Sequence, residues 1–340
     1  MREDAYTSAE SFAAWTLDLA ERALTQVPGD GAPVLLAFPE LIGLPLTFTL
    51  TPSAGAVRGS PGLREAALRS LRGDWRAVLA AALRYRALGP SALHLARALD
   101  VHRAYVGAFR AVARYTGATV VAGSALLPEV EVEAARGAHL TGSRVHNVAY
   151  TFAPGGALLG RSKKTFLTPG LESRGGIAPG RVEDLPVMRL PWGKLGVAIC
   201  LDGWYEGVVA HLDAAGAQVV VQPSANDADW ARPWPPDARV SEGEAWLTRG
   251  MNARLQERVN LVYGVNPMLV GDAFGFRPRG RSSVLANASA VRHAWAEGLS
   301  GVVALAPDSE GEAFVRASVE LPVGARASAP AAGAGGRMRP

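Results

Sequence analysis

Cysteine is almost absent from this chain of 340 residues, which holds a single one, Cys200. A lone cysteine cannot close an internal disulfide, so no disulfide framework supports the fold. The six histidines are scattered and lack the short spacings of a zinc or other metal site. The sequence also lacks a glycine-rich phosphate loop of the P-loop or dinucleotide-binding kind. These absences leave no sequence sign of a metal or an organic cofactor.

Long apolar runs are missing too, because no stretch approaches the roughly 18 residues that a membrane-spanning helix needs. The first twelve residues are polar and acidic, unlike the basic and then apolar start of a secretory signal. The formal net charge is only +4, and the surplus is not gathered in one long basic run. We therefore expect a cytoplasmic protein that binds neither membranes nor nucleic acid.

Apolar residues are plentiful and make up 49% of the chain, which is enough for one sizeable core. Residues 7–26 combine an N-capping Ser8 with a helical apolar period. Residues 57–117 are rich in alanine, leucine and arginine and predict three or four helices, with a break at 89–91. Apolar runs bounded by tight turns predict strands and hairpins. These runs lie at 32–40, 118–126, 147–167, 187–200, 217–225, 260–267, 280–296, 301–308 and 312–321.

Strands and helices thus alternate, which is typical of an α/β protein whose sheets are covered by helices. Residues 129–143 are locally acidic and are expected to form a surface loop, whereas 241–259 are expected to form one helix of about five turns. No linker divides the chain, so residues 1–323 are interpreted as a single domain with a helical insertion at about 58–117. Residues 324–340 are rich in Ala, Gly and Pro and are interpreted as a flexible tail.

Cys200 stands where an apolar run, Leu195 to Ile199, ends. A thiol in such a place is a common core residue. It is also a candidate nucleophile if a base and an oxyanion-binding group lie beside it. Since no histidine is placed to serve as that base, carboxylates and lysines at the ends of other strands become the candidates.

Three such residues stand out. Glu40 ends the apolar run 32–40, directly after a proline. Lys164 is one of only three lysines among 35 basic residues, which favours a position that needs a compact ammonium charge. Glu172 follows in the same stretch, eight residues later. Each of the three, taken alone, could equally be an ordinary surface or turn charge.

Taken together and in this order, the segments resemble the nitrilase, or carbon–nitrogen hydrolase, superfamily. The run "AFPELIG" around Glu40, the run "KTFLTP" that begins at Lys164 and the run "GVAICLD" around Cys200 match its three motifs. The similarity covers roughly residues 30–57 and 118–320. One departure follows the cysteine, because Glu206 occupies the place of a proline usual in the family.

This resemblance implies a four-layer α-β-β-α sandwich in which a Glu-Lys-Cys triad meets at strand ends. Glu40 would be the general base, Cys200 the nucleophile, and Lys164 with the backbone N–H of Leu201 the oxyanion-binding groups. The position of Glu172 matches a second glutamate found in many members, which would orient the lysine or the substrate. Members commonly dimerise, so the resemblance also implies a homodimer or a larger even oligomer.

The resemblance implies a small-molecule substrate with an amide, carbamoyl or nitrile group, which is cleaved through a cysteine thioester. The stretch after the cysteine is more similar to the amidase and carbamoylase branches than to the nitrile-cleaving branch. A nitrilase, an acyl transferase and a non-catalytic binding or scaffold relative remain the alternatives. Several side chains would line the substrate pocket in such a fold, although the aromatic ones could equally pack under the loops. The expected substrate-binding residues are Leu201, Trp204, Tyr205, Asn226 and Trp230.

Overall fold

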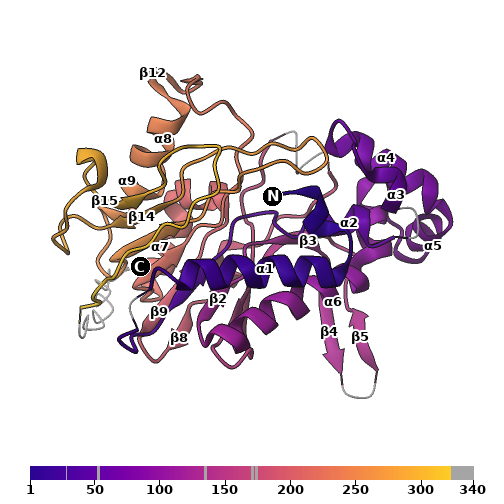
Figure 1. Cartoon of the computed structure of the whole chain (residues 1–340), viewed down its shortest axis with the longest axis horizontal. Coiled ribbons are helices and arrows are strands. Elements are labelled where there is room, and N and C mark those ends of the chain that lie inside the picture. The colour runs from indigo at the N-terminus through magenta and orange to yellow at the C-terminus, as the bar shows by residue number, and fades with distance from the viewer. Residues whose placement is uncertain (28, 52–53, 134–135, 170–171, 173–174, 323–340) are drawn as a thin grey trace, which may run out of the picture.

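Two β-sheets form the centre of the molecule, with helices packed against them (Figure 1). The computed structural model therefore has the mixed α/β fold that the sequence predicts. None of the described helices is long and apolar enough to cross a membrane. The predicted tail, 324–340, lies outside the described residues. The structure describes residues 1–322 except 28, 52–53, 134–135, 170–171 and 173–174.

The first sheet has the strand order β1-β2-β6-β3, and β7 pairs with β6. β1 and β2 run parallel, whereas the other pairings are antiparallel. Parallel neighbours need a long crossover connection, and the helices of residues 54–116 provide it. The strands are β1 (Leu35–Ala37), β2 (Thr119–Val121), β3 (Ala125–Leu127), β6 (His146–Phe152) and β7 (Leu158–Lys163).

The second sheet has the strand order β15-β14-β13-β10-β9-β8, in which β9, β10 and β13 are parallel. The carboxyl ends of parallel strands meet at one edge of a sheet, so the residues that follow β9 and β10 become neighbours there. The strands are β8 (Met188–Leu190), β9 (Gly193–Val197), β10 (Val219–Val221), β13 (Tyr263–Asn266), β14 (Ser283–Ala286) and β15 (Val302–Leu305).

The two longest helices, α1 and α6, pack along each other (Figure 1). The hydroxyl of Ser8 accepts a hydrogen bond from the N–H of Ser11 at 3.1 Å, which caps α1 as expected. Gly89 and Pro90 begin α6, in agreement with the predicted break. The helices are α1 (Ala9–Leu24), α2 (Leu46–Thr49), α3 (Ala54–Val57), α4 (Leu63–Gly73), α5 (Trp75–Tyr85), α6 (Pro90–Thr116), α7 (Glu206–Ala214), α8 (Glu242–Thr248) and α9 (Met251–Leu255), with 3-10 helices at Glu3–Tyr6, Val182–Asp184, Cys200–Trp204 and Ala296–Gly298.

Consecutive residues of the central strands belong to different apolar clusters, because side chains alternate across a sheet. On β2, Val120 packs in the cluster that contains Phe109 of α6. Its neighbour Val121 packs in a second cluster together with Val197 of β9, which belongs to the other sheet. The first sheet therefore has helices on one face and the second sheet on the other.

The second sheet shows the same alternation. Val219 and Val221 of β10 belong to the cluster between the sheets, whereas Val220 belongs to a third cluster with Val209 of α7 and Leu255 of α9. The first cluster thus lies between helices and the first sheet, the second between the two sheets, and the third between the second sheet and helices.

Two expectations about individual elements are wrong. Residues 129–143 form a hairpin of β4 (Val130–Glu133) and β5 (Gly137–Leu140), not a loop. Valine and glutamate alternate in this segment, and that period of two indicates a strand. The helix expected at 241–259 is divided into α8 and α9 at Gly250, where an added Cβ would come within 2.9 Å of the Trp204 ring.

Two further expected strands do not form. In 280–296 only β14 is a strand, and the second half is irregular before a 3-10 helix. Residues 312–321 pair with no strand of the described chain. Side chains hold this stretch instead: Arg22 forms an ion pair with Glu312 at 2.6 Å, and its guanidinium lies over the ring of Phe314.

Candidate active site

Four side chains from distant parts of the sequence meet in the interior. Glu40 follows β1, Lys164 follows β7, Glu172 lies in the loop after it, and Cys200 follows β9. All four are at most 5% exposed. Since charged residues are rarely buried without partners, their contacts decide what the site can do.

The ammonium of Lys164 lies between two carboxylates. Its Nζ atom is 2.8 Å from Oε1 of Glu40 and 2.7 Å from Oε2 of Glu172. It also donates to the hydroxyl of Thr168 at 3.2 Å. One cation thus faces two anions in a buried space, so the three groups together carry a net negative charge when all are ionised.

Asn147, at the start of β6, joins the same two carboxylates and was not identified from the sequence. Its Nδ2 atom donates to Oε1 of Glu40 at 2.8 Å and to Oε1 of Glu172 at 2.7 Å. The side chain is fully buried, and its Oδ1 atom has no partner among the described residues. The sequence signal that could have identified Asn147 is its place as a polar residue at the start of an otherwise apolar strand.

Cys200 has a strained backbone, with φ at +51°, in the left-handed region that non-glycine residues rarely adopt. Hydrogen bonds hold it there. Its N–H donates to the carbonyl of Pro223 at 2.8 Å, and its own carbonyl accepts from Nε2 of Gln222 at 2.7 Å. Asn266 in turn donates to Gln222. The network fixes the direction of the thiol.

Ala225, which follows β10, connects the thiol to Glu40. Its N–H donates to Oε2 of Glu40 at 2.9 Å, and its carbonyl accepts from Sγ of Cys200 at 3.8 Å. The sulfur and the carboxylate therefore share one backbone residue as a common support.

Asp202 ties the cysteine turn to the lysine segment. It is completely buried and accepts from the N–H of Thr165 at 3.0 Å and from the N–H of Phe166 at 2.7 Å. The hydroxyl of Thr165 donates to it at 2.8 Å. Burial raises the pKa of Asp202 to about 6, although these donors oppose the rise.

Burial is the largest single influence on the pKa values of Glu40, Lys164 and Cys200. It raises the pKa of Glu40, while the charge of Lys164 works in the opposite direction. It also raises the pKa of the Cys200 thiol, with a further contribution from the charge of Glu40. For Lys164 burial disfavours the ammonium, but the charges of the carboxylates, that of Glu40 above all, prevail and raise its pKa. At rest the site thus pairs a neutral thiol with a fixed ammonium.

Comparison with known proteins identifies the family. A sequence profile described as carbon-nitrogen hydrolase matches residues 5–256. The chain belongs to the carbon–nitrogen hydrolase family. It is accordingly a hydrolase of non-peptide C–N bonds. No curated protein sequence matches it significantly.

Solved structures share the fold of this hydrolase. An amidase of Nesterenkonia sp. AN1, in complex with butyramide, is 19% identical, with a TM-score of 0.51 over 84% of this chain and 81% of that one. Another is a carbon-nitrogen hydrolase of Helicobacter pylori G27, 19% identical, with a TM-score of 0.55 over 91% of this chain and 84% of the other.

The expected substrate-binding residues of the hydrolase differ in their surroundings. Leu201 follows the nucleophile candidate in the first turn of a 3-10 helix. Trp204 packs against Trp246 and Trp234, and Tyr205 stacks on Phe166 while remaining 41% exposed. These contacts agree with the alternative expected from the sequence, in which the two aromatic side chains pack under the loops.

Asn226 and Trp230 lie on the segment that follows Ala225. The Nδ2 atom of Asn226 is buried and has no partner among the described residues. Trp230 covers Gly243, where an added Cβ would lie 2.0 Å from its indole nitrogen. A buried amide nitrogen without a partner, one residue after Ala225, is a group that a polar substrate atom could satisfy.

Two cavities of about 310 Å³ and 450 Å³ lie outside this centre. The first is lined in part by His146, Tyr150 and Arg161, and the second in part by Leu88 and Ile177. Neither includes any of the four central residues.

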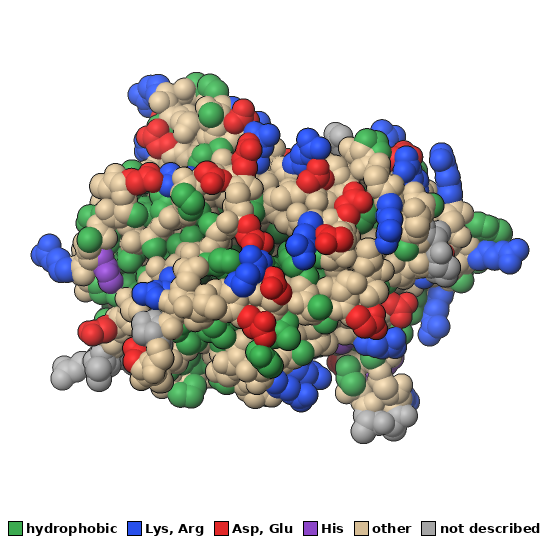
Figure 2. All heavy atoms as spheres, viewed as in Figure 1, with side chains coloured by type: hydrophobic (Ala, Val, Ile, Leu, Met, Phe, Trp, Pro, Cys, Tyr) green, Lys and Arg blue, Asp and Glu red, His purple; other side chains and the backbone are tan. Residues whose placement is uncertain are grey.

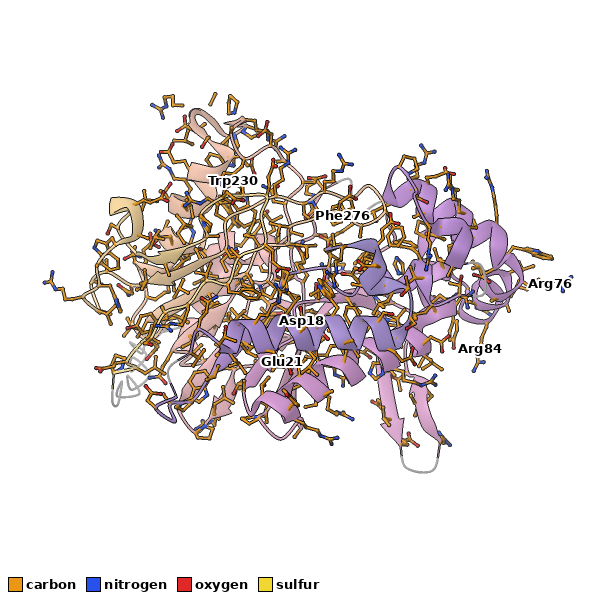
Figure 3. All side chains as sticks on the ribbon, viewed as in Figure 1. Asp18, Glu21, Arg76, Arg84, Trp230 and Phe276 are labelled. Carbon is orange, nitrogen blue, oxygen red and sulfur yellow. The ribbon has the colours of Figure 1, made fainter. Side chains whose placement is uncertain are left out.

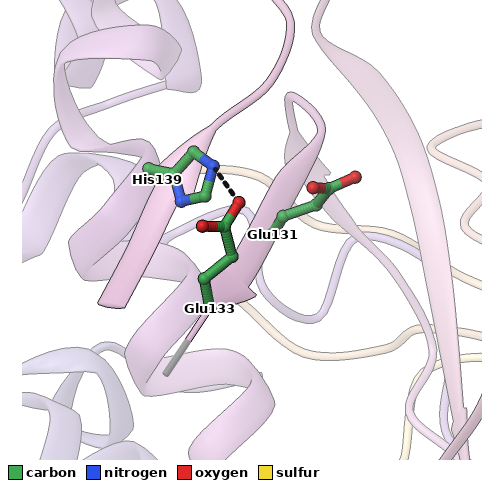
Figure 4. A group of neighbouring side chains, drawn as sticks. All are labelled: Glu131, Glu133 and His139. Carbon is green, nitrogen blue, oxygen red and sulfur yellow. Dashed lines mark ion pairs between the residues drawn. The ribbon is translucent and has the colours of Figure 1, made fainter. Parts of the chain in front are cut away.

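A group that could hold a cation lies on the β4–β5 hairpin, where Glu131, Glu133 and His139 share one face (Figure 4). The Nε2 atom of His139 is 3.4 Å from a carboxylate oxygen of Glu133. Both glutamates are exposed, and the arrangement is that of a surface ion pair.

Proposed function

We propose that the protein hydrolyses the C–N bond of a small amide or carbamoyl compound through a thioester on Cys200. The observation that carries this proposal is the joint contact of Glu40 with Lys164 and with the residue that supports the thiol, Ala225. A base, a cation and a nucleophile are the three groups that acyl transfer through cysteine requires.

In the first step Glu40 accepts the proton of the Cys200 thiol, and the sulfur attacks the carbonyl carbon of the substrate. The raised pKa of Glu40 suits this role, because a stronger base takes the thiol proton more readily. Proton transfer at the moment of attack avoids a free thiolate, which burial disfavours.

The tetrahedral intermediate carries a negative oxygen. We assign its stabilisation to the ammonium of Lys164 and to the N–H of Leu201, which has no intrahelical acceptor at the start of a helix. Collapse of the intermediate breaks the C–N bond, and Glu40 returns the proton to the departing amine or ammonia. Water activated by Glu40 then hydrolyses the thioester, yielding the acid and restoring the thiol.

Glu172 and Asn147 act as positioning residues in this scheme. Glu172 holds the second side of the Lys164 ammonium, and Asn147 spans both carboxylates. Together they keep the ammonium directed at one point. The N–H of Thr168 donates to Glu172 at 2.7 Å and fixes that carboxylate in turn.

A primary amide with a short acyl group is the substrate class that we favour, because an amidase of similar fold is known in complex with butyramide. Asn226 would offer its unpartnered Nδ2 atom to an acceptor on such a substrate. We assign Trp230, on the segment after Ala225, to the wall of the pocket, and we assign Trp204 and Tyr205 to the packing around it. The protein is proposed to act in the cytoplasm, as a homodimer or a larger even oligomer.

The test is an ammonia-release screen over short primary amides, carbamoyl compounds and nitriles. The proposal expects ammonia from an amide or carbamoyl compound and none from the Cys200→Ala variant. Release from nitriles alone would assign the protein to the nitrile-cleaving branch. Formation of a hydroxamate or a substituted amide in place of the acid, when amines are added, would show acyl transfer.

A further inference from the structure

The helices α4 and α5 carry an exposed apolar stripe outside the active site. Trp75, Leu79 and Leu83 recur every four residues along α5 and so lie on one face of it. They are 53%, 49% and 73% exposed. This region holds half of the twelve exposed large hydrophobic side chains of the described chain, here called the α4–α5 surface: Leu68, Leu71, Trp75, Leu79, Leu83 and Leu88.

The same region is strongly basic. Residues 58–88 contain seven arginines and two acidic residues, a formal charge of +5, whereas the whole chain carries +4. Both acidic side chains already have basic partners. Glu65 pairs with Arg69 at 2.9 Å, and Asp74 pairs with Arg97 at 2.8 Å.

The surface lies at one end of the molecule, where α3, α4 and α5 project from the sheets (Figure 1). Arg76 and Arg84 of α5 extend away from the protein (Figure 3). At this end Figure 2 shows hydrophobic and basic side chains next to each other. The opposite face of α5, with Val78 and Ala81, is buried, and α5 packs against α6. The stripe therefore faces outward.

We propose that the α4–α5 surface docks on the surface of anionic lipid membranes. Leucine and tryptophan enter the boundary between headgroups and acyl chains, and arginines around them meet the lipid phosphates. Their aliphatic stems cover apolar surface while the guanidinium groups stay in the headgroup layer. Docking of this kind needs no spanning helix, and it departs from the sequence expectation of no membrane partner.

Other occupants fit the surface less well. A symmetric contact between two copies would place this region against itself, with a charge of +5 facing +5. Nucleic acid would match the arginines but offers no apolar partner for a leucine stripe. A peptide helix docks in a groove, whereas this stripe lies on the outer face of α5.

Co-sedimentation of the full chain with vesicles tests the proposal. Vesicles of phosphatidylcholine mixed with phosphatidylglycerol should bind the protein, and phosphatidylcholine alone should bind it weakly. Added salt should release it, since charge attraction to the membrane is screened. Thermal unfolding of every variant checks that the fold is intact, independently of the proposed hydrolase activity.

One set of leucine variants and one set of arginine variants locate the contact. The double variant Leu79→Ser, Leu83→Ser should weaken binding to the vesicles at least about tenfold, because both leucines lose their burial in lipid. The control is Val259→Ser, also exposed but outside the surface, which should bind normally. Arg76→Ser and Arg84→Ser should each weaken binding about fivefold. Their control, Arg239→Ser on the β12 strand (Asp237–Ser241), should have no effect.

Absence of binding to anionic vesicles overturns the proposal. So does binding that the surface variants and their controls reduce equally. Dissociation of an oligomer into monomers by Leu79→Ser, measured by light scattering, would instead identify the surface as a contact between copies of this chain and likewise overturn it.

Discussion

The Nζ atom of Lys164 lies 2.8 Å from Oε1 of Glu40, and both side chains are buried. Removing one partner of such a pair leaves an uncompensated charge in the interior, which costs about 3–5 kcal/mol. The pair therefore supports the fold as well as the proposed chemistry, and variants must be examined for both effects.

Lys164→Met is expected to lower the free energy of unfolding by about 3 kcal/mol and to abolish hydrolysis, because it leaves two buried carboxylates without their cation. The adjacent Lys163 provides a matched control, since its ammonium pairs with Glu129 at the surface. Lys163→Met should change stability by less than about 0.5 kcal/mol. Urea unfolding of both variants decides the point, and equal effects would contradict the account.

The fall of kcat/KM on the acid side of its pH profile, the acid limb, should follow the protonation of Glu40. Burial raises its pKa above the ordinary value of 4.5. Below that raised pKa the carboxyl is protonated and cannot accept the thiol proton, so kcat/KM falls as the pH drops. Because the pKa of Asp202 is also raised, the profile should be repeated with Asp202→Asn, and the limb should persist. A limb at or below 4.5 would argue against Glu40 as the base.

Asn147→Ala should lower kcat about tenfold to hundredfold, the loss expected for hydrogen bonds to charged groups. Loss of a donor also raises the pKa of Glu40, so the acid limb should move to higher pH. A merely structural role would lower stability without moving that limb. Asn260→Ala, which removes a hydrogen bond to the carbonyl of Asp213, is the matched control.

Gly123→Ala should disturb the turn that carries Glu40. The residue has φ at +71°, and an added Cβ would lie 2.1 Å from the carbonyl oxygen of Pro39. Gly117 also has a positive φ, at +64°, but no atom lies within 4 Å of an added Cβ. Gly117→Ala should therefore lower the free energy of unfolding by only about 1 kcal/mol, the strain of a non-glycine backbone at a positive φ. Gly123→Ala should lower the free energy of unfolding by more than Gly117→Ala does, and it should also lose hydrolase activity. Equal losses of stability and activity in the two variants would contradict this prediction.

The sequence was sufficient to predict the fold and to select the four residues that meet in the interior. Glu40 and Cys200 stand at the ends of apolar runs, Lys164 lies just beyond an expected strand, and a shared family pattern gave their order. Their roles in catalysis stay predictions until the variants are measured. The mixed α/β fold is confirmed, because alternating strand and helix patterns are strong signals in apolar segments.

Asn147 and Asp202 could not be placed from the sequence in the same way. The partners of Asp202 lie 37 and 36 residues earlier, at Thr165 and Phe166, and only the packing of two sheets brings them together. From the sequence, Asp202 would be interpreted as a cap for its own turn. Similarly, counting charge over the whole chain concealed the basic stretch 58–88, because acidic residues elsewhere offset it.

Mass spectrometry of the enzyme during turnover tests the central claim most directly. Acid quenching with a short primary amide present should trap the acyl group on the peptide that contains Cys200, and Cys200→Ala should show neither the adduct nor ammonia release. Undiminished ammonia release by Cys200→Ala, or an acyl group on another residue, would contradict the account.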